Sequence, residues 1–270
     1  MLLHLSDTHF GTEQEPVVEA LVRWAVEQRP GLVVLSGDIT QRARRRQFDA
    51  ARRFVQRLGP VPTLVIPGNH DIPLFNLAAR LFAPYAGYIK AFGAELEPVI
   101  ELPRWLVIAL NTTRPYRHKH GELSAQQVER VAARLKRATR AQLRVVVVHQ
   151  PIAVVSNEDR NNRLRGATDA AIACWAEAGA DLVLGGHIHL PYVAALHKRV
   201  HGLARPMWAV QAGTAVSRRV RPGAPNSINA VRWGDTLPNG KCVVERWDYR
   251  AQTASFSKES ESVLDTALAR

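Results

Sequence analysis

The sequence of 270 residues has only two cysteines and no apolar run of membrane-spanning length. Cys174 and Cys242 lie in separate apolar stretches without a partner at metal-ligand spacing. They therefore indicate small core side chains in a reducing compartment rather than a disulfide framework. No basic, apolar and small-residue leader precedes the first strand-like run. We expect a cytoplasmic protein without a transmembrane segment.

Acidic residues and lysines are also scarce. The chain has 36 basic and 24 acidic side chains, a formal net charge of +12, and thirty of the basic residues are arginine. Such a charge favours anionic ligands. The arginines of residues 41–58 surround a helical apolar stripe, so we predict a solvated outer helix face. Contact with nucleic acid or an anionic lipid is the alternative, and the oligomeric state stays open between a monomer and a homodimer.

The order of strand-like and helical patterns indicates the fold class. Apolar strand-like runs alternate with helical patterns up to about residue 180, and the runs after residue 190 are strand-like with no helix between them. This order predicts an α/β protein in which two sheets pack together with helices outside. We expect a single domain over residues 1–258 and a C-terminal tail over residues 259–270 that frays or forms a short helix.

Five of the apolar runs end in polar groups. In chain order these groups are Asp7 with His9, Asp38, the tetrad "GNHD" at 68–71, His149, and His187 with His189. In open α/β sheets ligands bind outside the carboxyl ends of the strands, so we expect these side chains to converge. Taken singly, each aspartate could instead cap a helix, and His149 could be an ordinary core histidine.

The run "DLVLGGHIHLP" at 181–191 carries two of these histidines. If the chain stays extended, its period of two places His187 and His189 on the same side, converging on one point. The two glycines before them permit a tight turn. A second His-x-His pair, His118 and His120, follows no buried strand, and we predict that it does not bind metal.

The converging set supplies seven nitrogen and oxygen donors and no thiolate, which is too many for one four-coordinate zinc ion. It suits two divalent or mixed-valence transition metal ions about 3.5 to 4 Å apart. Mixed imidazole and carboxylate donors favour manganese, iron or zinc, with cobalt and nickel as alternatives. The seven predicted ligands are Asp7, His9, Asp38, Asn69, His149, His187 and His189.

Across residues 5–190 the motifs "DTH", "GD", "GNHD", "VHQP" and "GHIH" occur in one order. This series resembles the calcineurin-like metallophosphoesterase superfamily. In size and motif spelling the chain is similar to the bacterial class III cyclic-nucleotide phosphodiesterases and their glycerophosphodiesterase relatives. The resemblance implies a four-layered α/β/β/α sandwich of two mixed sheets with flanking helices.

The resemblance also implies a role for each site residue. Asp7, His9 and His189 would bind one metal, Asn69, His149 and His187 the other, and Asp38 would bridge them. His70 would be a catalytic residue outside the metal ligands, close to the substrate. Asp71, the other predicted catalytic residue, would orient the His70 ring.

The activity implied is hydrolysis of a small anionic phosphodiester, such as 3′,5′-cyclic AMP, by a metal-bridging hydroxide, with His70 assisting the leaving oxygen. The alternatives are a phosphomonoesterase, a nuclease, a pyrophosphatase of a lipid precursor, and a non-catalytic scaffold. Two arginine-rich loops, residues 158–166 and 214–227, could hold the substrate or be solvated surface loops.

Overall fold

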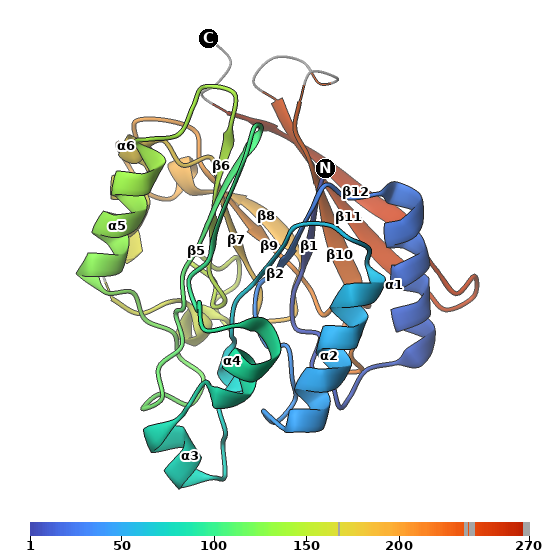
Figure 1. Cartoon of the computed structure of the whole chain (residues 1–270). Helices are drawn as coiled ribbons and strands as arrows, with labels where there is room; N and C mark the ends of the chain where they lie inside the picture. The colour runs from blue at the N-terminus through green and yellow to red at the C-terminus, as the bar shows by residue number, and fades with distance from the viewer. Residues whose placement is uncertain (167, 235–236, 238–240, 267–270) are drawn as a thin grey trace.

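The computed structural model describes residues 1–166, 168–234, 237 and 241–266, and its strands form two sheets (Figure 1). The strands of the first sheet are β1 (Leu2–Leu5), β2 (Leu32–Leu35), β3 (Thr63–Val65), β10 (Ser227–Arg232), β11 (Lys241–Arg250) and β12 (Ser255–Asp265). Those of the second are β4 (Val99–Leu102), β5 (Trp105–Ala109), β6 (Leu143–Val147), β7 (Leu182–Gly185), β8 (Tyr192–Ala195) and β9 (Trp208–Gln211).

Helices cover the outer faces of both sheets. The α-helices are α1 (Glu15–Gln28), α2 (Arg45–Arg57), α3 (Leu77–Phe82), α4 (Ala86–Phe92), α5 (Ala125–Leu135) and α6 (Thr168–Ala178). Short 3-10 helices are η1 (Asn69–Asp71), η2 (Arg160–Asn162) and η3 (Leu196–Lys198). Figure 1 shows α5 and α6 on one side of the molecule and α1 and α2 on the other. In the described residues, no helix is both long and apolar enough to cross a membrane.

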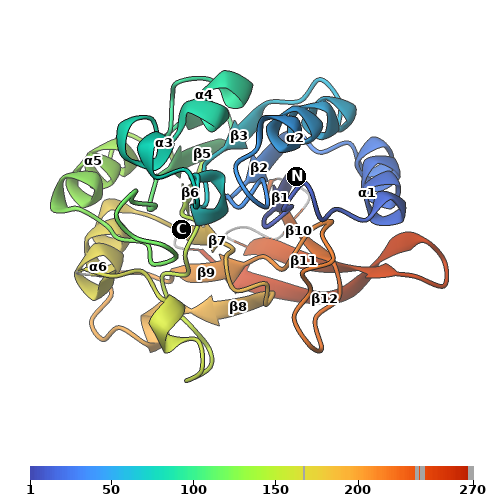
Figure 2. The ribbon, with the colours of Figure 1, turned by 90° about the horizontal axis from the view of Figure 1, so that it is seen from below.

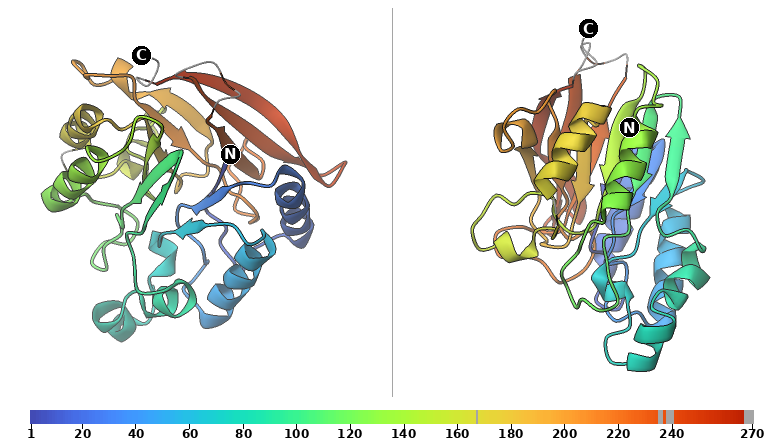
Figure 3. Two further views of the ribbon diagram at one scale, coloured as in Figure 1. Left: turned by 45° about the horizontal axis from the view of Figure 1, so that its top comes forward. Right: turned by 90° about the vertical axis from the view of Figure 1, so that its left-hand side faces the viewer.

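Both sheets are mixed. The first has the strand order β12-β11-β10-β1-β2-β3, in which β1, β2 and β3 are parallel and β10, β11 and β12 pair antiparallel. The second has the order β4-β5-β6-β7-β9-β8, with β5, β6, β7 and β9 parallel. The four layers can be followed in Figure 2 and Figure 3. The predicted four-layered sandwich is confirmed.

The alternation of side chains along β1 explains why the strand is apolar at every position but one. Leu3 and Leu5 belong to the core between the first sheet and its helices, whereas Leu2 belongs to the core between the two sheets. Val145 and Val147 of β6 meet Leu2 in that central core, and both are fully buried. A strand buried on both faces has an almost continuous apolar sequence.

The arginine-rich helix α2 has the predicted two faces. Phe48, Ala51 and Phe54 are buried in the core under the first sheet, and Arg52 and Arg53 are exposed. The exposure of Arg52 and Arg53 confirms the predicted solvated outer face for these two arginines. The helix itself begins at Arg45, a few residues after the basic stretch starts.

The C-terminal segment differs from the prediction. Residues 255–265 form β12, which pairs with β11 along its length, so the proposed boundary at residue 258 falls inside a strand. The expectation of a frayed tail or short helix from residue 259 is wrong up to Asp265, and residues 267–270 lie outside the described residues. The run "SKESES" looks unlike a core strand because β12 is an edge strand, and edge strands commonly carry exposed charged side chains.

Phe256 tests whether β12 belongs to the fold. Its ring is 7% exposed and lies 5.7 Å from the Tyr249 ring, centre to centre. We expect Phe256→Ala to lower the free energy of unfolding by about 3 kcal/mol, because it leaves a cavity in the core. Val263→Ala in the same strand, where the side chain is 57% exposed, should have little effect. Equal denaturation midpoints for Phe256→Ala and the parent would contradict a structural role for β12.

Candidate metal centre

The turns that carry the predicted ligands have an unusual backbone. Positive φ angles of 53°, 41°, 48°, 74° and 57° occur at Asp7, His9, Asp38, His187 and His189. L-residues adopt this conformation at a cost of about 1–3 kcal/mol each, and such strain is concentrated at functional sites. The condition under which His187 and His189 would share one side, an extended chain, is not met: β7 ends at Gly185 and the chain turns there, as the two glycines permit.

The two histidines consequently join different clusters. His189 lies with Asp7 and His9, and one ligand atom from each lies within 4.8 Å of the others. The Nε2 of His189 lies 3.2 Å from Asp7 Oδ1 and 3.1 Å from His9 Nε2. Its Nδ1 donates to the carbonyl of Arg219 at 2.5 Å. That hydrogen bond fixes the ring so that Nε2 faces the cluster.

The second cluster contains Asp38, His149 and His187, again with ligand atoms within 4.8 Å of one another. Asn69 lies beside it, with Oδ1 at 3.3 Å from His149 Nε2. The Nδ1 of His149 donates to the carbonyl of Ser36 at 2.8 Å. His149 is thus oriented in the same way as His189, through a backbone carbonyl.

Asp38 lies between the two clusters and presents one carboxylate oxygen to each. Oδ1 is 3.2 Å from His149 Nε2, and Oδ2 is 3.7 Å from His9 Nε2. The same Oδ1 accepts the backbone N–H of His70 at 2.8 Å. Two adjacent clusters of imidazoles and carboxylates that share a carboxylate are suited to a dinuclear metal site.

The electrostatics of the clusters fit bound cations. Burial alone would raise the pKa of Asp7 and Asp38, but their histidine neighbours reverse this effect and hold both values well below the ordinary range. Burial lowers the pKa of His9 and His187 to about 3. Ionised carboxylates and neutral imidazoles are the forms that bind metals.

His149 and His189 differ from His9 and His187, because a neighbouring carboxylate outweighs burial and raises the pKa of each imidazole, Asp7 being the neighbour of His189. Burial opposes the protonation of His149, but the adjacent carboxylate of Asp38 prevails and raises the pKa of His149 to about 9.

Two polar atoms of the clusters, Asp7 Oδ1 and His187 Nδ1, are buried without a hydrogen-bond partner among the described residues. Buried polar atoms of this kind require a partner, and a metal ion at these clusters supplies one.

Two glycines allow the strand-end turns to pack this closely. A β-carbon on Gly186 would overlap Ser6 Oγ and Asp7 Oδ2, and one on Gly68 would overlap the backbone and carboxylate of Asp38. The glycines of "GNHD" and "GGH" are therefore required by the approach of neighbouring turns.

Comparison with known proteins agrees with this arrangement. The sequence pattern of the family described as calcineurin-like phosphoesterase matches residues 1–191. The chain belongs to the calcineurin-like phosphoesterase family. It is 27% identical, over 169 residues, to a protein of Synechococcus sp. named "Probable cyclic nucleotide phosphodiesterase", and the match covers 62% of this chain and 61% of that protein.

Two further proteins are similar to this chain. Glycerophosphodiester phosphodiesterase GpdQ of Enterobacter lignolyticus is 36% identical over 84 residues, which are 26% of this chain and 29% of GpdQ. The chain thus matches less than two thirds of the length of either curated relative. A dimetal phosphatase from Danio rerio has the same fold, with a TM-score of 0.65, 12% identity and 98% of each chain covered.

His70 lies at the edge of the two clusters. Its ring makes an edge-to-face contact with the His9 ring at 4.8 Å, and it forms a third group with His9 and Asp38 within 4.8 Å. The carbonyl of Gln41 lies 3.0 Å from its Nδ1, and an Arg219 guanidinium nitrogen lies 3.2 Å from its Nε2.

Asp71 does not orient the His70 ring, contrary to the prediction. Its carboxylate accepts the backbone N–H groups of Ile39, Thr40 and Gly68 and the hydroxyl of Thr40, at 2.8–3.0 Å. Burial, with the nearby negative charge of Asp38, raises the pKa of Asp71 to about 6. Asp71 instead ties the "GNHD" turn to the loop after β2, because this turn leaves backbone donors that need an acceptor.

A cleft of about 440 Å³ opens over the clusters. Arg219 and Arg221, from the predicted loop 214–227, line it together with His118 and Lys119. The sequence pattern raised His118 only as a metal ligand, and it did not predict His118 or Lys119 as part of the cleft. They follow the carboxyl end of β5, so the rule that located the other site residues would also have located them.

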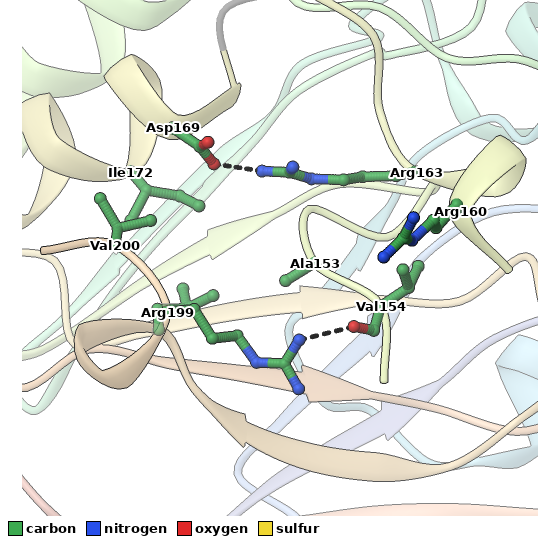
Figure 4. A pocket seen from close by; sticks show the side chains of 9 residues that line it. Ala153, Val154, Arg160, Arg163, Asp169, Ile172, Arg199 and Val200 are labelled. Carbon is green, nitrogen blue, oxygen red and sulfur yellow. Dashed lines mark hydrogen bonds and ion pairs between the residues drawn. The ribbon is translucent and has the colours of Figure 1, made fainter. Parts of the chain in front are cut away.

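The predicted loop 158–166 divides between two cavities. Asp159 and Asn162 line the cleft over the clusters, and Asp159 pairs with Arg221 at 2.9 Å. Arg160 and Arg163 instead line a separate cavity of about 380 Å³, which also contains Arg199 (Figure 4). Arg160 and Arg163 therefore line a cavity other than the cleft over the candidate metal centre.

Asp38→Asn tests the shared carboxylate. If Asp38 contacts both ions, the variant should lose at least one metal equivalent per chain, because an anionic oxygen is lost from each site. His118→Ala and His120→Ala should retain the parent metal content, since neither residue belongs to a metal-suited group in the described residues. Elemental analysis of the purified variants makes the comparison. Full occupancy in Asp38→Asn would exclude the bridging role.

Proposed function

We propose that the chain is a cytoplasmic, dinuclear metal-dependent phosphodiesterase that hydrolyses a small phosphodiester. The observation that carries the proposal is the position of Asp38 between two imidazole-carboxylate clusters beneath a cleft lined by cationic side chains. The names of the two curated relatives, a cyclic nucleotide phosphodiesterase and a glycerophosphodiester phosphodiesterase, support a diester substrate. A cleft of about 440 Å³ is of a suitable size for a nucleotide.

The metal ligands in this proposal divide by cluster. Bound ions in this arrangement supply activation of water and neutralisation of charge on the phosphoryl group. The backbone carbonyls of Ser36 and Arg219 hold the His149 and His189 rings in place. One ion would be held by Asp7, His9 and His189, the other by Asn69, His149 and His187, and both by Asp38.

Arg219 would bind the substrate phosphate. Its guanidinium contacts Gln41 Oε1 at 3.0 Å and the His70 ring, and within the described part of the chain no ion pair joins it to a carboxylate. A planar guanidinium without an acidic partner is well suited to phosphoryl oxygens. Arg221 is less available, because Asp159 pairs with it.

His70 would donate a proton to the leaving oxygen. The Gln41 carbonyl accepts from Nδ1, and Nε2 lies 3.2 Å from an Arg219 nitrogen in the cleft that both side chains line. A positioned general acid accelerates a reaction by about 10²- to 10⁴-fold. In this role His70 acts on the substrate and is not one of the seven proposed metal ligands.

The substrate class can be tested with matched aryl phosphates. With manganese-loaded protein we expect turnover of a bis-aryl phosphate to exceed that of the mono-aryl phosphate, together with measurable hydrolysis of 3′,5′-cyclic AMP. The basic cleft and the names of the relatives underlie this expectation. Faster cleavage of the monoester would favour a phosphomonoesterase, and cleavage restricted to single-stranded DNA would favour a nuclease.

Leaving-group dependence tests the role of His70. A general acid matters most for a poor leaving group, whereas a group that stabilises charge on phosphorus matters about equally for all. His70→Ala should keep its metals and lose about 10²-fold or more in kcat on an alkyl or ribose ester. Its loss on a bis-nitrophenyl ester should be clearly smaller. Equal losses would exclude the acid role, and reduced metal content would identify His70 as a ligand.

A further inference from the structure

Four large apolar side chains project into solvent from one short segment, residues 75–82, which we call the apolar tip. Phe75, Leu77, Leu81 and Phe82 are each 73% to 83% exposed. Figure 1 and Figure 3 show α3, which carries three of them, standing out from the body of the molecule. Several large apolar side chains exposed in one short segment indicate an interaction site in a folded protein.

Cationic side chains surround the base of the apolar tip. The Arg42 guanidinium lies over the Phe75 ring, 5.4 Å from its centre. Arg80 donates to the carbonyl of Arg117 at 2.7 Å, which connects α3 to the loop before His118. Burial, followed by the charges of Arg80 and other nearby cations that include Lys119, lowers the pKa of His118.

Acidic side chains are absent from the same stretch of sequence. Residues 72–94 contain no aspartate or glutamate, and they include Arg80 and Lys90. The tip therefore combines exposed phenyl and leucyl groups with the neighbouring cationic side chains of Arg42 and Lys119. This combination matches a surface with an apolar interior and anionic headgroups.

We propose that the apolar tip docks this protein onto the surface of an anionic phospholipid bilayer. Phe75, Leu77, Leu81 and Phe82 enter the boundary between headgroups and acyl chains, and the exposed side chains of Arg42 and Lys119 meet the lipid phosphates. A second copy of the chain is a poorer occupant. A two-fold symmetric contact would bring the cationic side chains of both copies together, and like charges across an interface are unfavourable.

The apolar tip adjoins the cleft. Leu74, directly before it, lines a small hollow together with His70, Asn69 and Arg42. Docking through the tip therefore brings the mouth of the metal cleft close to the bilayer surface. The proposal concerns this surface alone and holds whether or not the cleft acts on phosphodiesters.

Vesicle sedimentation with the full chain tests the proposal. We expect binding to vesicles of phosphatidylcholine mixed with phosphatidylglycerol, weaker binding to phosphatidylcholine alone, and a decrease with added salt. Phe75→Ser/Phe82→Ser should lower the partition coefficient about tenfold or more, because two large apolar groups no longer enter the lipid. Val26→Ser/Val263→Ser, at side chains 60% and 57% exposed elsewhere, is the matched control and should bind like the parent.

Three results would overturn the proposal. They are no binding to anionic vesicles, equal binding by the tip variant and the parent, and a parent dimer that the tip variant converts to a monomer in sedimentation equilibrium. The tip variant should hydrolyse a water-soluble diester at the parent rate, since neither phenylalanine lines the cleft. Loss of vesicle binding with that rate unchanged separates docking from catalysis, and a parent inactive on every diester refutes the proposed function alone.

Discussion

Two carboxylates buried at the ends of neighbouring strands impose the main physical constraint on this structure. Asp7 and Asp38 are 0% and 1% exposed, and both are held ionised by imidazoles. Burying negative charge is costly unless positive charge or metal accompanies it. The histidines at the other strand ends, the carbonyls that orient them and the glycines that let the turns approach all serve this requirement.

The two-sheet core stabilises a site that the local sequence alone would not form. Five strand-end residues adopt left-handed backbone conformations, each at an energetic cost. The central core between the sheets, with fully buried side chains such as Leu32, Val145 and Leu182, offsets that cost. The parallel strands carry their turns to the same place, so the position of each ligand depends on packing that lies well away from it.

The sequence predicted the layers and the converging residues because each depends on local signals, namely apolar periodicity and polar groups at strand ends. The sequence did not predict the features that depend on hydrogen bonds between residues far apart in the chain. The polar run in β12 becomes a strand only because the edge of β11 offers it hydrogen bonds. Asp71 accepts backbone donors from the loop after β2, and no motif encodes that contact. The extended-strand pattern alone did not separate His187 from His189, whereas the family resemblance did, and a turn places them in two clusters.

Each cluster takes side chains from both sheets. Asp7 and His9 follow β1 in the first sheet, whereas His189 follows β7 in the second, and the other cluster likewise combines Asp38 with His149. An ion held by either cluster would therefore act as a cross-link between the two halves of the sandwich, closing chain loops of more than a hundred residues. Sliding of one sheet over the other would change ligand distances, so the rigidity of the whole sandwich and the affinity of the site for its ions are thermodynamically linked.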